Sequence, residues 1–170
     1  VIESSYERVI GIMDRIIMRQ GFVMGSRPGS SDFAIFGQLT QLGLVDPTPA
    51  RYLERHSPRL RAWLDRAEDL SGLHAQDWLS RDAIIEHLGE LLGEIGRVYA
   101  PFLIANEKAA HESNESFETT IDGKPWVQPV FPYQVKCLAA IRHARNSMPE
   151  QARHDLDSML TGTGCEMLFT

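Results

Sequence analysis

The stretch FVMGSRPGSSDFAIFGQL, residues 22–39, decides the fold of this chain. It follows Gly21, a residue suited to end a helix because glycine adopts a left-handed backbone without strain. A turn containing Gly and Pro occupies 25–29. Asp32 then stands where a carboxylate can accept hydrogen bonds at the positive end of a helix. The stretch predicts two helices joined by a turn.

Apolar residues on both sides of this stretch recur at the spacing of buried helix faces. Upstream, the spacing predicts a helix from Ser5 to Arg19. A second helix is predicted from Asp32 to Leu42, with apolar residues such as Phe33 buried over nearly its whole circumference. Further helices are expected at 49–56, from Pro58 to Ser71, from Ser80 past Phe102, from Tyr133 to Met148, and finally up to Gly162.

The long helix after Ser80 contains two kinds of residue that weaken helices. Pro101 should kink it, because proline lacks the backbone donor and crowds the preceding turn. Gly89, Gly93 and Gly96 each cost roughly 1 kcal/mol of helix propensity relative to alanine. We therefore expect another part of the chain to approach this face closely, as in tight helix packing, rather than a ligand groove.

Residues 117–130 interrupt the helical pattern. Two strand-like runs flank Asp122-Gly123, a pair typical of hairpin turns. Pro125 and Pro129 restrict the second run to an edge strand or an irregular loop. The sequence thus predicts an all-α fold, a bundle of about six to eight helices with a small hairpin or irregular insertion near 117–130.

Composition limits the function classes. The chain has 170 residues, of which 43% are hydrophobic, enough to bury a core as a single helical domain over 1–170. Its 17 basic residues are scattered among 23 acidic ones for a net charge of -6, so nucleic-acid and membrane partners are not expected. Two unpaired cysteines suggest a reducing compartment, and we expect a cytoplasmic protein. The start at Val1, without a leader, is interpreted as a cut in a longer protein.

The histidines and cysteines show no motif for a metal or a nucleophile. None of the six histidines forms a His-x-x-x-His pair or a cluster with cysteine, so no metal site is expected. Cys137, beside Leu138 on a predicted helix, is interpreted as a buried small hydrophobe. Cys165 follows Gly164 in a tail that we expect to be flexible and exposed. The sequence therefore assigns no catalytic residue.

The stretch at 22–39 resembles the box in the C-terminal domain of glutathione transferases, where an apolar clasp and Gly-x-x-Pro lead to a Ser/Thr-x-x-Asp capping box. Asp32 matches the aspartate of the family, and the resemblance implies a structural capping role for it. Gly29 departs from it, because glycine offers no side-chain acceptor where the family usually has Ser or Thr. The segment SPRLRAWLDR, residues 57–66, also looks like the family's next signature, a proline-started helix with Trp and Arg.

The resemblance covers residues 1–70, most firmly from Ser5 onward, and leaves 71–170 as a longer helical extension. Within the extension, 125–134 looks like a subfamily addition of transferase-like proteins. In this family a thioredoxin-like N-terminal domain binds glutathione and supplies the Tyr, Ser or Cys that activates its thiol. The resemblance implies that such a domain is the missing partner, with glutathione the cosubstrate of the full-length protein. It implies further that this chain lines the pocket for a small electrophilic substrate, and that a homodimer is usual.

Six residues are candidates for that pocket wall, because they combine aromatic faces with uncharged hydrogen-bonding groups. They are Trp126, Gln128, Tyr133 and Gln134, with Tyr99 and Phe102 beside the expected kink as second-rank members. An alternative role for the first four, which we favour, is to anchor the hairpin onto the bundle.

Two other functions stay open. The fold also serves as a non-catalytic protein-interaction module, so enzyme activity is not decided by the fold. An unrelated helical bundle that binds an apolar ligand is the third possibility, and the departure at Gly29 is its best support.

Overall fold

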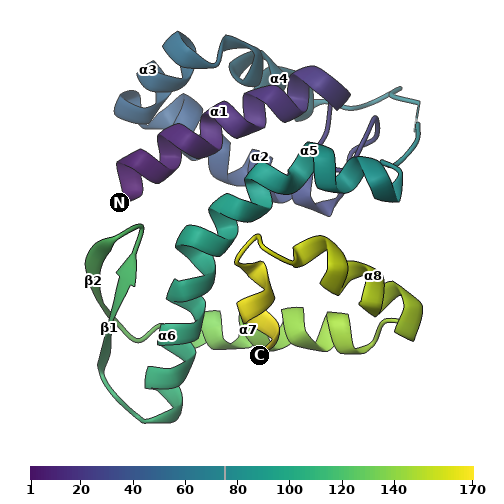
Figure 1. The fold of residues 1–170 in the computed structure, drawn as a ribbon. Helices are drawn as coiled ribbons and strands as arrows, with labels where there is room; N and C mark the ends of the chain where they lie inside the picture. Colours follow the sequence, from purple (N-terminus) through teal and green to yellow (C-terminus); the bar gives the residue numbers. More distant parts are fainter. Residues whose placement is uncertain (75) are drawn as a thin grey trace. The chain divides into compact units, whose positions relative to one another are not determined.

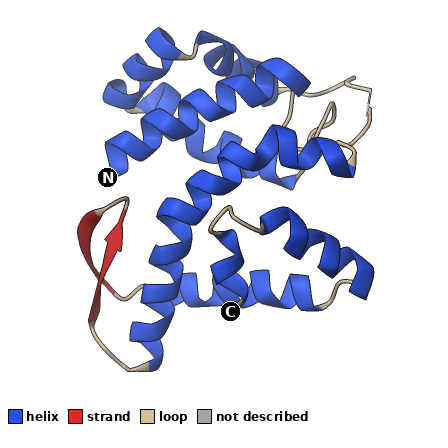
Figure 2. Ribbon diagram, in the orientation of Figure 1, coloured by secondary structure: helices blue, strands red, loops and turns tan. Residues whose placement is uncertain are grey.

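The computed structural model describes residues 1–74 and 76–170, and it confirms an all-α fold with one small hairpin (Figures 1 and 2). The helices are α1 (Ile2–Gln20), α2 (Ser30–Thr40), α3 (Pro47–His56), α4 (Pro58–Glu68), α5 (Arg81–Glu94), α6 (Ala100–His111), α7 (Pro132–Asn146) and α8 (Glu150–Leu160). Short helical turns are η1 (Gln41–Val45), η2 (Ile95–Tyr99) and η3 (Cys165–Phe169), and the strands are β1 (Ser116–Ile121) and β2 (Lys124–Pro129).

The chain forms two compact units, a first unit of residues 2–91 and a second unit of residues 92–170. The boundary falls inside α5. The single domain expected over 1–170 stays a prediction, and each unit is described by itself.

The core of the first unit is made by apolar faces of α1, α3 and α4. α1 contributes Ile10 and Met13, both inaccessible to solvent, at the spacing that predicted the helix. α4 contributes Leu60 and Leu64. Trp63 also lies on α4 and donates from its indole nitrogen to the carbonyl of Gly21, over 3.0 Å. This bond joins α4 to the left-handed residue that follows α1.

The apolar clasp at 22–24 and the start of the turn after it are bonded to a distant segment. Leu79 donates its N–H to the carbonyl of Met24, and Ser26 donates to the carbonyl of Asp77. Gly25 lies between these bonds with a φ of +139°, and a Cβ there would lie 2.6 Å from the oxygen of Asp77. Glycine is therefore required by both the backbone angle and the space.

The prediction that α2 is buried over nearly its whole circumference is wrong. Leu39 is buried, but Phe33 is 56% exposed and Leu42 is 38% exposed. The α-helix ends at Thr40, and the wider π-helical turn η1 continues the chain from Gln41. α2 carries apolar residues on every face. The rest of the first unit covers the face that carries Leu39, so apolar side chains on the other faces remain at the surface.

The second unit has its own core, built on α6. Its buried members come from α6, α7, α8 and η3, and they are Ala100, Leu103, Leu138, Leu160, Cys165 and Leu168. The expectation that Cys165 is exposed is wrong, since its residue is 3% exposed. Its thiol donates to the carbonyl of Leu92 over 3.2 Å. The glycines before Cys165 form a tight turn rather than a flexible tail, because Gly162 and Gly164 both adopt positive φ angles.

The helical segment after Ser80 changes its geometry before Pro101. Residues 95–99 form the π-helical turn η2, and the N–H of Ala100 bonds the carbonyl of Ile95. The expected close approach holds for Gly96, where a Cβ would lie 2.7 Å from the backbone of Gly164. It is wrong for Gly89 and Gly93, where a Cβ would meet no atom within 4 Å.

The insertion at 117–130 is a regular antiparallel hairpin. Asp122 and Gly123 have φ angles of 52° and 71°, as a tight hairpin turn requires. Ile121 and Lys124 pair across this turn and form the first hydrogen-bonded pair of the hairpin. In an antiparallel ladder, hydrogen-bonded pairs recur at every second residue along each strand. Pro125 and Pro129 occupy the alternate positions, where the backbone points away from β1. The prolines therefore cost the hairpin no ladder bond.

Candidate functional site

Asp32 is placed by the start of α2. It is 2% exposed, and its two carboxylate oxygens accept from the N–H of Val23 over 2.8 Å and of Gly29 over 2.9 Å. The side chain thus supplies one half of a capping box and also holds the clasp. How much this stabilises the fold stays a prediction.

Trp78 lies beside Gly29, the residue at which this chain departs from the family pattern. A Cβ at this position would lie 3.4 Å from the ring of Trp78, at the limit of ordinary contact. The guanidinium of Arg27 stacks on the same ring at 4.5 Å. Trp78 therefore covers the N-terminus of α2 on the side where a serine or threonine side chain would project.

Three of the six expected pocket residues lie together in the second unit. The hydroxyl of Tyr99 donates to the side-chain oxygen of Gln134 over 2.7 Å. The rings of Tyr99 and Phe102 are stacked, with centroids 6.0 Å apart. Burial, and then the nearby Cys137, raises the pKa of the Tyr99 hydroxyl, while the bond to Gln134 acts in the opposite direction. Tyr99 therefore remains a neutral hydrogen-bonding group near neutral pH, and it is 40% exposed.

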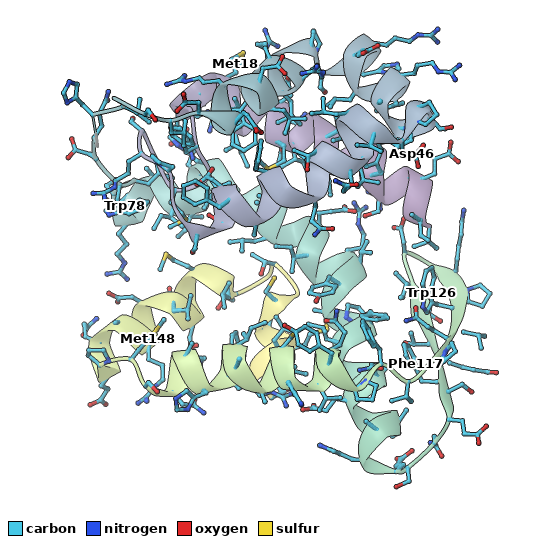
Figure 3. The ribbon with its side chains drawn as sticks, turned by 180° about the vertical axis from the view of Figure 1, so that it is seen from behind. Met18, Asp46, Trp78, Phe117, Trp126 and Met148 are labelled. Carbon is cyan, nitrogen blue, oxygen red and sulfur yellow. The ribbon has the colours of Figure 1, made fainter. Side chains whose placement is uncertain are left out.

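The hairpin brings two further candidates to the edge of this group. Trp126 donates from its indole nitrogen to Gln128 over 3.3 Å, and Gln128 pairs across the strands with Phe117. Phe117 is buried, and its ring lies edge-on to Phe102 at 5.5 Å. Figure 3 shows Phe117 and Trp126 on the hairpin. Cross-strand partners share one face of a hairpin, so Gln128 shares the face of Phe117. Tyr133 is instead 64% exposed, with its ring 6.5 Å from that of Phe131.

Asn106 is a positioning residue that the sequence did not reveal. It is fully buried on α6, and its side-chain amide donates to the carbonyl of Phe131 and accepts from the N–H of Phe131, over 3.0 and 2.7 Å. This pair of bonds fixes the backbone just before α7 and hence the start of the helix that carries Gln134. In the sequence, the signal for this role was that a single Asn stands among the apolar positions of a helix.

A groove lies in the first unit, where no site was expected. It is a groove of about 870 Å³ lined by residues from α1, η1 and α3, including Tyr6, Leu42, Arg51, Tyr52, Arg55 and His56. Sequence reasoning considered His56 for metals alone. The sequence did contain a signal for the groove on α3. Arg51 and Arg55 are four residues apart, as are Tyr52 and His56, and residues at this spacing are neighbours on one helix face.

Among the described residues, no group of three or more His, Cys, Asp or Glu side chains could hold a metal ion. Over the same part of the chain, no helix has the length and apolar character needed to cross a bilayer.

Residues 2–66 match the family described as glutathione S-transferase, C-terminal domain. This part of the chain, from α1 through most of α4, is a glutathione-transferase C-terminal-like helical domain. The match includes both the stretch at 22–39 and the segment at 57–66, the two segments that carry the resemblance. No curated protein and no solved structure matches the chain.

Proposed function

We propose that this chain is the C-terminal half of a glutathione transferase, in which it lines the pocket for a small electrophilic substrate. The observation that carries the proposal is the family match over 2–66, with Asp32 at the start of α2. Glutathione is the cosubstrate, and it is bound by a thioredoxin-like domain outside this chain. That domain also supplies the group that activates the thiol, so the 170 residues alone are not catalytic.

The group around Tyr99 supports the pocket role. A partly exposed hydroxyl, an amide from Gln134 and the face of Phe102 combine apolar contact with a few oriented polar groups, as small-molecule sites do. The hydroxyl is held by Gln134 rather than by a charged group. Because its hydrogen is bonded to Gln134, the hydroxyl fixes the position of the Tyr99 ring, whose face is then available to a substrate, and it is not suited to act as a base.

Conjugation of glutathione to chlorodinitrobenzene tests this role, in a longer protein that carries the chain behind a thioredoxin-like domain. We expect Tyr99→Phe and Phe102→Leu to raise the KM for the electrophile by about threefold to tenfold, without changing the KM for glutathione. Val127→Ala, an exposed change on β2, is the matched control. Unchanged kinetics in both test variants would remove Tyr99 and Phe102 from the pocket.

A non-catalytic interaction module is the second candidate, and exposed apolar side chains favour it. Phe33 on α2 is 56% exposed, while Leu44 and Val45 on η1 are 43% and 68% exposed. Large apolar side chains that are exposed to solvent are available for a contact with another protein. The interaction module would be the supported function if a longer protein that carries this chain neither bound glutathione nor conjugated electrophiles.

A further inference from the structure

The segment formed by η2 and α6 contacts the start of α7 at two points. At the first, the hydroxyl of Tyr99 donates to the side-chain oxygen of Gln134 over 2.7 Å. Two helical turns further along, Asn106 bonds both the N–H and the carbonyl of Phe131, over 2.7 and 3.0 Å. The N–H of Gln134 donates to the same carbonyl over 3.1 Å. A continuous chain of hydrogen bonds therefore links Asn106 to Tyr99.

Apolar packing does not hold the first turn of α7 in place. Phe131 and Tyr133 are both exposed, and Leu138 is the residue of α7 whose side chain is buried. Phe131 stands at the N-cap position of the helix, where a phenylalanine offers no side-chain acceptor. The position of the first turn therefore depends on the two bonds from Asn106.

Asn106 is suited to this task because an amide both donates and accepts hydrogen bonds. Its side chain is inaccessible to solvent. An ionised carboxylate at this position could accept from the N–H of Phe131, but it would repel the carbonyl, and an aliphatic side chain could make neither bond. Loss of the amide would thus leave a backbone group of Phe131 without its partner.

The ring of Tyr99 is held at two places. Its hydroxyl is fixed by Gln134, and its face is stacked on Phe102 with 14° between the ring planes. Gln134 is the third residue of α7, so a shift of the first turn moves the side-chain oxygen to which Tyr99 donates. A small displacement of a substrate-positioning group weakens function even when its cause lies elsewhere. The position of the Tyr99 ring thus depends on a residue that a substrate does not reach.

We propose that Asn106 is a positioning residue of the electrophile pocket, and that it sets the affinity for the electrophile through Gln134 and Tyr99. This inference rests on the proposed function, because the pocket is part of it. Asn106 acts without touching the substrate, since its side chain is fully buried. Substitutions at Asn106 and at Gln134 interrupt the same chain of bonds, so their effects should not be additive.

Nuclear magnetic resonance of the 170-residue chain tests the chain of bonds without any transferase chemistry. The four tyrosines are labelled with ¹³C at Cζ, and the signal of Tyr99 is the one missing from Tyr99→Phe. Asn106→Asp keeps an acceptor and loses the donor at neutral pH, so it should move this signal in the same direction as Gln134→Met does. Lowering the pH should return the signal toward its wild-type position, because a protonated carboxyl regains a donor.

Two further variants complete the spectra. Asn146→Asp makes the same exchange at the exposed end of α7, and as the matched control it should leave the Tyr99 signal unchanged. Asn106→Ser is too short to reach Phe131 and buries no charge. It should shift the Tyr99 signal without the return at low pH, and it replaces Asn106→Asp if that variant does not fold.

A double-mutant cycle in the longer protein measures the effect on the pocket. Asn106→Asp and Gln134→Met should each raise the KM for chlorodinitrobenzene by about threefold to tenfold, and the two together should raise it no further. The KM for glutathione should not change. A loss of stability alone would instead lower kcat, through the fraction of enzyme that is folded, and leave the KM for the electrophile unchanged.

The proposal is overturned if the Tyr99 signal stays at its wild-type position in a folded Asn106 variant, as judged by circular dichroism. It is also overturned if the two increases in KM multiply in the double variant. A longer wild-type protein that conjugates no electrophile would contradict the proposed function instead. The tyrosine spectra of the chain would then still decide whether Asn106 positions Tyr99.

Discussion

The carboxylate of Asp14 on α1 accepts a hydrogen bond from the backbone N–H of Leu60, in the first turn of α4, over 3.3 Å. Asp14 is 8% exposed and Leu60 is fully buried. The first N–H groups of a helix have no partner within it, so α1 supplies an acceptor that α4 needs. Arg59 reaches the same carboxylate over 3.1 Å, but its side chain is 63% exposed.

This arrangement predicts that replacing Asp14 lowers the free energy of unfolding more than replacing Arg59 does. Asp14→Ala should lower the free energy of unfolding by about 2 kcal/mol, because it leaves a buried N–H without an acceptor. Arg59→Ala should lower it by less than about 0.5 kcal/mol, because an exposed ion pair is screened by water. Urea denaturation of both variants measures the difference. Equal losses would show that the ion pair, and not the backbone bond, is what matters.

Asp32→Ala should also destabilise the first unit, by about 2 kcal/mol, since the N–H groups of Val23 and Gly29 both lose their acceptor. Asp32→Asn keeps one acceptor oxygen and should fall between the wild type and the alanine variant. Thermal melting followed by circular dichroism measures the series. A melting temperature unchanged in Asp32→Ala would contradict the capping role.

Two glycines of the same helical segment should respond oppositely to alanine. Gly96→Ala forces a Cβ to within 2.7 Å of the Gly164 backbone, and we expect a loss of about 2 kcal/mol or more. Gly93→Ala meets no atom within 4 Å and should stabilise the helix by up to about 1 kcal/mol. Chemical denaturation of the two variants compares them. Similar stabilities would mean that η3 does not pack against Gly96 in solution.

Burial raises the pKa of the Cys165 thiol above its ordinary value of 9.0. At pH values above 9.0 the thiol ionises first in the unfolded state, which then binds fewer protons than the folded state, so the free energy of unfolding falls as pH rises. Below that pH both states hold the proton and this dependence is absent. Cys165→Ala should therefore show a smaller loss of stability between pH 8 and pH 10.5 than the wild type, when unfolding in urea is compared across that range. Parallel pH profiles would contradict the burial of this thiol.

The sequence predicted those features that depend on local patterns. The spacing of Ile10 and Met13 located α1, Gly21 located its end, and Asp122-Gly123 located the hairpin turn. The two boxes at 22–39 and 57–66 pointed to the family that matches residues 2–66.

Features that depend on contacts between distant residues were missed. Cys165 looked exposed because glycines precede it, and its burial follows from packing of η3 against the Gly96 region. α2 looked buried because its apolar residues cover every face, and a sequence does not show which face is covered. The groove was missed for the same reason, since the meeting of Tyr6 with Tyr52 joins two helices.

The proposed function requires glutathione to bind outside this chain, in the domain that completes the transferase. Calorimetric titration of glutathione into the 170-residue chain, and into a longer protein that carries it behind a thioredoxin-like domain, tests this claim most directly. We predict saturable binding to the longer protein and none to the chain alone. Binding to the chain alone would contradict the divided site, and binding to neither would contradict the transferase itself.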